Sequence, residues 1–246
     1  MRSKTVLRLF VSTLLAAVLG RLDVVSSACG QAAWDGGGSN DNWSTVANWR
    51  NDLAPVSGVS ASVSFRGSTR TTPVQDIASP FDLAQLDFET GAASFDLSGN
   101  GLRFHGNSAR IRNLASSAQT VRCNIEFVET LSVVSTTGGP VEVRATISGD
   151  GLLTTDGPSF VLFSQSNDYT GVTNVRGGTL RLGADGALPD GARLNVDRFG
   201  ILDLNGYGVL VSDISGSGSI ALGGSDFTIS IADQESFSGA ITGTGA

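Results

Sequence analysis

The chain contains 246 residues, of which 32 are glycine, and 40% of its residues are hydrophobic. The glycines follow no three-residue period, which excludes collagen, and the hydrophobic content excludes a chain that is disordered throughout. The formal net charge is −7 and the one lysine is Lys4. The chain therefore lacks the basic surface that binds phosphate backbones, and we expect no nucleic-acid partner.

The first residues have the organisation of a secretory signal peptide. Three basic residues open the chain: Arg2, Lys4 and Arg8. The apolar run at 9–20 is shorter than the roughly 20 residues of a membrane span but fits the core of a signal peptide. Small residues follow this run, and we expect cleavage after Ala32, which makes residues 1–32 the signal peptide. The expected location is extracellular or on a bacterial cell surface, with no membrane span after cleavage.

Two alternatives exist for this segment, an N-terminal membrane anchor and a lipoprotein acylated at Cys29. Ser26 stands where an acylation site has Leu or Val, and Cys29 lies far from the apolar run. Without residues 1–32 the chain has 12 arginines and 22 acidic residues, a net charge of −10. Cys123 is then the one remaining cysteine, and we expect a buried, unreactive thiol.

Short stretches of alternating hydrophobic and polar residues dominate the rest of the chain, and helical periodicity is hard to find. We predict strands within nine stretches: 62–65, 95–104, 124–134, 141–147, 179–182, 193–196, 201–206, 218–224 and 226–231. Each is bounded by Gly, Asn-Gly, Asp-Gly or Gly-Gly, which are turn residues. The spacing fits either a sandwich of hairpins or a stack of parallel strands, and periodicity alone does not decide between them.

Internal similarity favours the stack. The sequence ISGDG at 147–151 recurs as ISGSG at 214–218 and as ITGTG at 241–245. An aromatic-Ser/Thr-Gly turn also recurs, in NDYTGVTNV at 167–175 and ESFSGAITG at 235–243. The copies are unevenly spaced, so we interpret them as a degenerate repeat. Recurring units that share a core by stacking are what a solenoid requires.

The segment 147–188 resembles the autotransporter-associated beta strand repeat family. The resemblance depends on thirteen positions: Gly149, Gly151, Gly157, Asn167, Tyr169, Thr170, Gly171, Val175, Gly178, Thr179, Leu180, Leu182 and Gly183. The stretch 192–208 continues the family's pattern. Upstream, 33–49, 62–72 and 86–104 look like the segment that often precedes these repeats in secreted proteins. The resemblance implies an all-β chain folded as a right-handed parallel β-helix, with Leu180 and Leu182 inside and Thr179 and Arg181 facing water.

We therefore expect an N-terminal capping segment at 33–66 and a β-solenoid at 67–246. In this family the turn before Ala246 introduces another strand, so the solenoid looks truncated at its C-terminus. An exposed apolar edge is expected there, with end-to-end self-association as its consequence.

All three tryptophans, Trp34, Trp43 and Trp49, fall within the expected cap. Their clustering predicts that they cover the open first coil, because the end of a solenoid exposes an apolar hole. The alternative is a glycan-binding module in which the aromatic rings stack on sugars. Asp35 and Asp41 in the same segment are weak candidates for calcium, since they lack the spacing of known calcium loops.

Candidates for catalysis are few. His105 is the one histidine and has no nucleophile motif beside it, and a zinc site needs more His and Cys than the chain contains. Polysaccharide hydrolysis needs two facing carboxylates, for which Asp203 and Asp213 are the candidates. Their flanks predict solvated strand and turn, so we expect no enzymatic activity, no cofactor and no metal.

The sequence thus predicts an exported, non-enzymatic β-solenoid that acts as a surface or extracellular stalk of the adhesion type. Its expected partner is an extracellular glycan or another cell-surface molecule. A glycan-binding module that uses the tryptophans and a polysaccharide-active enzyme are the two alternative functions.

Overall fold

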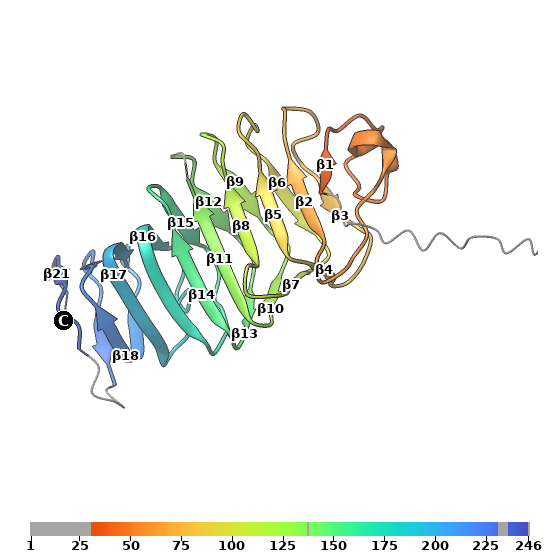
Figure 1. Ribbon diagram of the computed structural model, residues 1–246. Helices are drawn as coiled ribbons and strands as arrows, with labels where there is room; N and C mark the ends of the chain where they lie inside the picture. Colours follow the sequence, from red (N-terminus) through yellow and green to blue (C-terminus); the bar gives the residue numbers. More distant parts are fainter. Residues whose placement is uncertain (1–30, 137, 231–235, 246) are drawn as a thin grey trace, which may run out of the picture.

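The computed structural model describes three ranges: residues 31–136, 138–230 and 236–245. The signal peptide expected at 1–32 lies outside them except for its last two residues. Parallel strands are stacked into a β-solenoid of about eight turns (Figure 1), and the described residues contain two short 3-10 helices, η1 (Val46–Asn48) and η2 (Arg50–Asp52). The expected all-β fold of stacked parallel strands is confirmed. Neither helix in the described ranges is long enough to cross a membrane.

The strands lie on three faces that run along the solenoid, here called faces A, B and C. Face A contains β1 (Ala32–Trp34), β2 (Ser62–Phe65), β5 (Gln85–Phe88), β8 (Arg110–Asn113), β11 (Thr130–Ser135) and β14 (Leu152–Asp156). Face B contains β3 (Val74–Gln75), β6 (Asp96–Gly99), β9 (Gln119–Val121), β12 (Val141–Val143), β15 (Phe160–Phe163), β19 (Ser219–Ala221) and β21 (Ala240–Thr242). Face C contains β4 (Phe81–Leu83), β7 (Leu102–Phe104), β10 (Ile125–Phe127), β13 (Ile147–Gly149) and β20 (Phe227–Ile229).

Three longer strands bend from one face to the next. They are β16 (Val172–Leu182) and β17 (Ala192–Asp203), which pass from face A to face B, and β18 (Val209–Gly216), which passes from face C to face A. Because of these strands, pairing joins faces A and B, together with β20 of face C, into one sheet of 17 strands, while β4, β7, β10 and β13 form a separate sheet of four.

Successive strands on face A are separated by similar lengths of chain. Asp87 and Arg112 are register partners on β5 and β8, and they lie 25 residues apart in the sequence. Later coils are shorter, since the register partners Asn195 and Ser215 lie 20 residues apart. One coil of the solenoid therefore takes between 20 and 25 residues at these positions.

Side chains alternate between the interior and the surface along each strand, as a period of two residues requires. In β11, for example, Leu131, Val133 and Ser135 are buried while the residues between them are partly exposed. The register places like residues over one another, and Phe65 stacks on Phe88 with ring centroids 5.5 Å apart. Leu180 and Leu182 are buried and Arg181 is exposed, as the sequence predicts. The core is thus a continuous column of apolar side chains between the three faces.

The recurring ISGxG sequence marks corners of the coil rather than equivalent positions in successive coils. The first copy leads from β13 on face C to β14 on face A, and the second leads from β18 on face A to β19 on face B. The third copy ends β21 on face B. The first glycine has a positive φ in all three copies, which suits a residue without a Cβ. From one copy to the next, the chain completes a whole number of coils and then crosses one more face. The intervals between the copies are therefore uneven.

Asn167, in the NDYTG sequence, connects three successive coils. Its side-chain oxygen accepts a hydrogen bond from the backbone N–H of Ile147, at 2.8 Å. Its side-chain NH2 donates to the backbone carbonyl of Ala187, at 2.7 Å. Asn167 is buried, so its amide replaces backbone hydrogen bonds where face C has no regular strand.

Gly171 stands where two coils approach too closely for a side chain. A Cβ atom at this position would overlap the backbone carbonyl oxygen of Gly151, one coil earlier. Backbone atoms of a packed coil cannot move aside as the end of a flexible side chain can, so the overlap must be relieved by separating the coils.

Replacing Gly171 with Ala is therefore expected to lower the free energy of unfolding by about 1–3 kcal/mol or more, the usual cost of overpacking. Gly58→Ala is the matched control, because a Cβ at Gly58 meets no atom within 4 Å and its φ is not positive. Urea unfolding followed by circular dichroism measures both. Equal stability of the two variants would contradict the close approach of the coils at Gly171.

Candidate functional site

The three tryptophans expected in the cap form one aromatic cluster inside the N-terminal end of the solenoid. Trp34, Trp43 and Trp49 are all buried, with exposures of 0%, 0% and 1%. The ring of Trp49 packs edge-on against Trp34 and against Trp43, with centroids 5.1 and 5.5 Å apart. Phe65 of β2 lies 5.9 Å from both Trp34 and Trp43, so the cluster continues directly into the aromatic column of the core.

This position differs from what a sugar-stacking role needs. A ring that stacks on a sugar must present one face to solvent, and these three rings present none. The indole N–H groups of two of them point to backbone carbonyls instead: Trp49 Nε1 donates to Trp43 at 2.7 Å, and Trp34 Nε1 donates to Arg70 at 3.2 Å. The glycan contacts considered for Trp34, Trp43 and Trp49 are therefore not supported by their geometry, which is that of a packed end.

The expected boundaries at this end also differ from the structure. β2 lies within the expected cap of 33–66, yet it pairs with both β1 and β5 and is a regular strand of face A. The covering segment is the stretch between β1 and β2, which carries η1 and η2. The expected cleavage after Ala32 falls within β1, where Ala32 pairs with Val63.

Truncation of Trp49 to Ala is expected to lower the free energy of unfolding by about 3–5 kcal/mol, because a large buried side chain is lost. Leu53→Ala in the same segment is the control. The Leu53 side chain is 69% exposed, so we expect a change within about 0.5 kcal/mol. Denaturant unfolding of both variants tests this, and an unchanged Trp49→Ala protein would show that the cluster does not hold the end together.

The remaining candidate residues lie apart from one another. His105 follows β7 on face C, and its Nε2 lies 2.8 Å from Asp82 Oδ1. Asp203 lies on face B, where it pairs with Arg181 at 3.0 Å. Asp213 lies on face A, in register with Arg193. Asp203 and Asp213 thus occupy different faces and do not form the facing pair that glycoside hydrolysis uses.

Cys123 and the acidic residues of the cap lie in surroundings that fit a structural role rather than reactivity or metal binding. Cys123 is free and buried at the corner between β9 and β10, and burial raises the pKa of its thiol to about 12. Asp35 accepts a hydrogen bond from the backbone N–H of Gly37 at 3.1 Å. Asp41 accepts from Arg70 at 3.2 Å, so an arginine already neutralises it. Within the described ranges, no three His, Cys, Asp or Glu side chains gather as metal ligands would.

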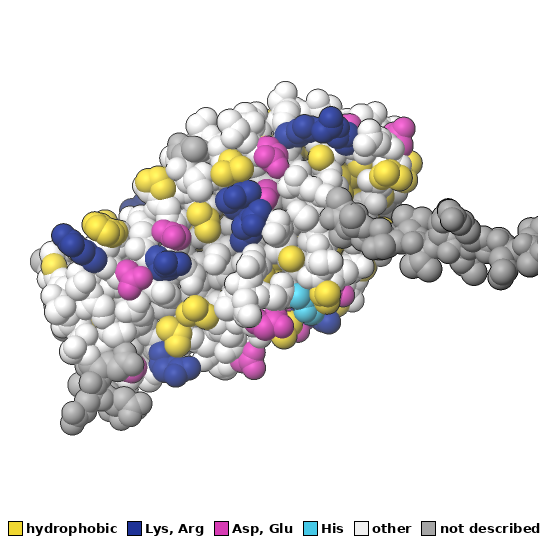
Figure 2. All heavy atoms as spheres, viewed as in Figure 1, with side chains coloured by type: hydrophobic (Ala, Val, Ile, Leu, Met, Phe, Trp, Pro, Cys, Tyr) yellow, Lys and Arg dark blue, Asp and Glu magenta, His cyan; other side chains and the backbone are white. Residues whose placement is uncertain are grey.

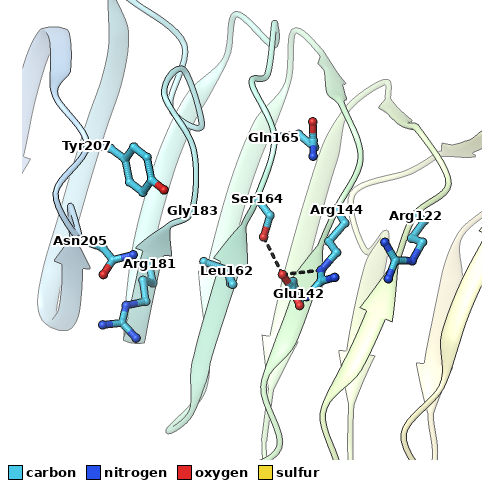
Figure 3. Close-up of a pocket in the computed structure, with 10 residues that line it drawn as sticks. All are labelled: Arg122, Glu142, Arg144, Leu162, Ser164, Gln165, Arg181, Gly183, Asn205 and Tyr207. Carbon is cyan, nitrogen blue, oxygen red and sulfur yellow. Dashed lines mark hydrogen bonds and ion pairs between the residues drawn. The ribbon is translucent and has the colours of Figure 1, made fainter.

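A polar groove of about 580 Å³ lies on face B. Figure 3 shows it, with Tyr207 at one end and Arg122 at the other. Ten residues line it: Arg122, Glu142, Arg144, Leu162, Ser164, Gln165, Arg181, Gly183, Asn205 and Tyr207. They come from five successive coils, and we call this feature the face B groove.

The groove exists because side-chain size changes along one column of the solenoid. Val121, Val143, Phe163 and Leu182 are in register. The residues that follow them are Arg122, Arg144, Ser164 and Gly183. Two long side chains are thus followed by two short ones, and the surface is hollow where the short ones lie. Beyond Gly183, the Asn205 side chain donates to the carbonyl of Leu182 at 3.0 Å.

Each arginine of the face B groove has a carboxylate partner. Arg122 pairs with Asp96 at 2.7 Å, Arg144 with Glu142 at 2.6 Å, and Arg181 with Asp203 at 3.0 Å. The guanidinium and carboxylate charges therefore largely cancel. The groove offers fixed hydrogen-bond donors and acceptors and the ring of Tyr207, a surface suited to a neutral polar ligand rather than to a strongly charged one.

Glu142 is the carboxylate within the lining of this groove. Burial disfavours its charged form, but the hydrogen bonds from Arg144 and Ser164 and the charges of Arg144 and Arg122 outweigh burial. The pKa of Glu142 is consequently lower than its ordinary value. An acid with a lowered pKa is ionised at neutral pH and cannot donate a proton there, so Glu142 does not fit the role of a general acid.

The lowered pKa of Glu142 predicts a pH-dependent contribution to stability. A carboxylate whose pKa is lower in the folded protein stabilises the fold above its unfolded value of about 4.3, and this contribution is lost as pH falls through the folded pKa. We expect Glu142→Gln to lower the free energy of unfolding by about 1 kcal/mol at pH 7.

The difference from the unsubstituted protein should vanish in acid, and urea unfolding between pH 7 and pH 2.5 measures it. Glu126→Gln is the control, because Glu126 pairs with Arg103 through a side chain that is 49% exposed, and its effect should be smaller. A Glu142→Gln effect that is the same at every pH would contradict the role assigned to its charge.

Sequence reasoning missed the face B groove because its residues are scattered from 122 to 207. A signal was nevertheless present. Carboxylates and arginines recur one coil apart, as in Asp96–Arg122 and Arg181–Asp203. Glu142 and Ser164, which are hydrogen-bonded to each other, lie 22 residues apart. Writing the sequence in rows of 22 residues brings the charged residues of neighbouring coils close together. Coil length varies, however, so a fixed period misaligns successive coils by several residues unless the positions of the corners are known.

Comparison with known proteins shows that segments of this chain are similar to parts of much longer proteins. The chain is 40% identical over 106 residues to the adhesin BmaC autotransporter of Brucella suis biovar 1 (strain 1330), a match that covers 40% of this chain and 3% of that protein. In Escherichia coli (strain K12) it is 30% identical over 118 residues to the uncharacterized protein YuaQ, which covers 47% of this chain and 9% of YuaQ.

A third relative is the uncharacterized lipoprotein YdeK of Escherichia coli (strain K12), 40% identical over 80 residues, which covers 32% of this chain and 6% of YdeK. The chain thus spans less than a tenth of the length of each relative. No family model and no solved structure matches the chain. The chain is therefore a β-solenoid that is homologous to part of an autotransporter adhesin.

Proposed function

We propose that this chain is exported and forms a rigid, non-enzymatic solenoid segment of an adhesion-type surface protein. The observation that carries the proposal is the unbroken parallel pairing along face A, from β1 to β18, in a chain that is homologous to part of an autotransporter adhesin. We also propose that residues 147–188 are a repeat of the autotransporter-associated beta strand type, since their turns occupy the corners of the coil.

The stacked coils supply stiffness through their backbone. Successive coils are hydrogen-bonded by strand pairing along faces A and B and by β4, β7, β10 and β13 on face C, so N–H to carbonyl bonds run along the axis of the solenoid. Interior side chains such as Val63, Leu86 and Ile111 stack in register and exclude water. An extended rod of this kind holds its length outside a cell, where no partner protein is needed to keep it straight.

The two alternative functions have less support. Binding of a glycan through the tryptophans needs exposed rings, and these rings are buried. A polysaccharide-active enzyme needs two carboxylates across a cleft, and Asp203 and Asp213 lie on different faces. The acidic side chains at the face B groove are paired with arginines.

Expression of the full chain with an internal epitope tag in a Gram-negative host tests the proposal. We expect protein outside the inner membrane that is accessible to antibody on intact cells or recovered from the medium. Its N-terminus, read by mass spectrometry, should precede Gln31, because Ala32 belongs to β1. Purified protein should give small-angle X-ray scattering of an elongated rod.

A variant that lacks the apolar run 9–20 is the matched control and should stay in the cytoplasm. Full-length protein in the cytoplasm with Met1 retained would overturn the export proposal. A compact scattering profile would overturn the proposed role as a rigid spacer, whatever the location.

A further inference from the structure

A second polar surface lies on face A at the N-terminal end, away from the face B groove. It consists of two hollows of about 370 and 490 Å³ that share Gln31 and Glu89. Four arginines line them: Arg50, Arg66, Arg110 and Arg112. Figure 2 shows arginine side chains gathered over this end of face A. We call the two joined hollows the face A basin.

Two of its arginines are held in place by a buried carboxylate. Asp87 is 1% exposed and is covered by the side chains of the next coil. Arg110 donates to both of its oxygens, at 2.9 and 2.8 Å, and Arg112 donates to Oδ2 at 2.9 Å. One carboxylate thus neutralises one of two positive charges. The Nε of Arg112 is buried and has no hydrogen-bond partner in the described part of the chain.

The other two arginines have no acidic partner among the residues that the structure describes. Neither Arg50 nor Arg66 forms an ion pair there, although Arg66 is half-buried. Glu89 follows Phe88, the register partner of Phe65, so it is next to Arg66 on the neighbouring coil. The Glu89 carboxylate instead accepts a hydrogen bond from Gln31 at 3.3 Å.

The charge of the face A basin is therefore opposite to that of the molecule. Its lining has four arginines against Asp87 and Glu89, whereas residues 33–246 carry a net charge of −10. The face B groove differs from the face A basin in this respect, since every arginine that lines the groove has a carboxylate partner. Guanidinium groups without partners, in a hollow of ligand size, are suited to bind an oxyanion through two parallel hydrogen bonds.

We propose that the face A basin binds the carboxylate or sulfate group of a single acidic sugar at the end of a glycan. Arg50 and Arg66 bind the anionic group, and Gln31 and Thr90 hydrogen-bond the neighbouring hydroxyls. The net negative charge of residues 33–246 disfavours a long polyanion, so an isolated anionic sugar fits better than nucleic acid or a polymer charged at every unit. The choice of a sugar rests on the proposed surface location, whereas binding of an anion does not.

Titration of the purified, isotope-labelled protein tests the site by NMR. The probes are an oligosaccharide that ends in glucuronic acid and the matched oligosaccharide that ends in glucose. We expect the Nε–Hε signals of Arg50 and Arg66 to shift with the acidic probe and to stay in place with the neutral one. The double variant Arg50→Gln/Arg66→Gln should weaken binding by about tenfold or more, since it removes both guanidinium groups that would donate charge-assisted hydrogen bonds to the anion.

Arg193→Gln/Arg198→Gln is the matched control, because both arginines lie on β17 at the other end of the chain and form no ion pair among the described residues. It should bind as the unsubstituted protein does. Equal binding by the Arg50/Arg66 variant, or equal binding of the acidic and neutral probes, would overturn the proposed site.

Two further probes separate the sources of the anion. Inorganic sulfate that competes as well as the acidic sugar would overturn the sugar assignment while leaving an anion site. Stronger binding to phosphatidylglycerol vesicles than to the sugar would overturn it in favour of a lipid surface. These results do not depend on where the protein is found in the cell, so failure of the site and failure of the export proposal are distinguishable.

Discussion

The backbone pairing between successive coils is the constraint on which the rest of this structure depends. Each N–H and carbonyl on the three faces must meet its counterpart one coil away, so the chain has to return to the same place after every circuit. Coil length can vary, from 25 residues between Asp87 and Arg112 to 20 residues between Asn195 and Ser215, provided that the difference is absorbed at the corners. Glycine and asparagine are concentrated there for this reason: Gly171 permits close approach of two coils, and Asn167 bonds to the coils on either side of it.

The same register decides which charges meet on the surface. Asp87 and Arg110, Glu126 and Arg103, and Asp96 and Arg122 are each 23 to 26 residues apart in sequence. Acidic residues that look singly scattered along the chain are therefore partners across neighbouring coils. Exposed pairs of this kind add little stability individually, but they fix the orientation of long side chains on an otherwise flat sheet. The face B groove is a product of this arrangement, with paired arginines on one side and the short side chains of Ser164 and Gly183 on the other.

The stacking of parallel strands could be predicted from the internal similarity of the sequence and from its resemblance to a repeat family, whereas the two-residue period alone left hairpins open. The inward side chains Leu180 and Leu182 could be predicted from the alternation along their strand. The location of the tryptophans at the N-terminal end of the solenoid could also be predicted, whereas their edge-on packing could not. The copies of ISGxG were interpreted as a degenerate repeat because of their uneven spacing, and in the structure they lie at three different corners. Local sequence records that a corner is present but not which faces it joins, and that assignment depends on the length of every coil between the copies. The two polar surfaces escaped prediction for the same reason.

The interruption of the regular coil at the N-terminal end accounts for the two arginines of the face A basin that form no ion pair among the described residues. The first coil, in which Ala32 pairs with Val63, is longer than those that follow it on face A, and the extra chain carries η1, η2 and Arg50. A residue in such an insertion has no counterpart one coil away, so Arg50 lies outside the pattern that gives Arg122, Arg144 and Arg181 their carboxylate partners. The neighbouring Arg66 follows a strand next to this insertion and is likewise left without an ion pair in the described residues. Pairing between regular coils neutralises Arg122, Arg144 and Arg181, whereas the long first coil leaves two arginines close together without ion pairs among the described residues, and such a place suits recognition of a charged ligand.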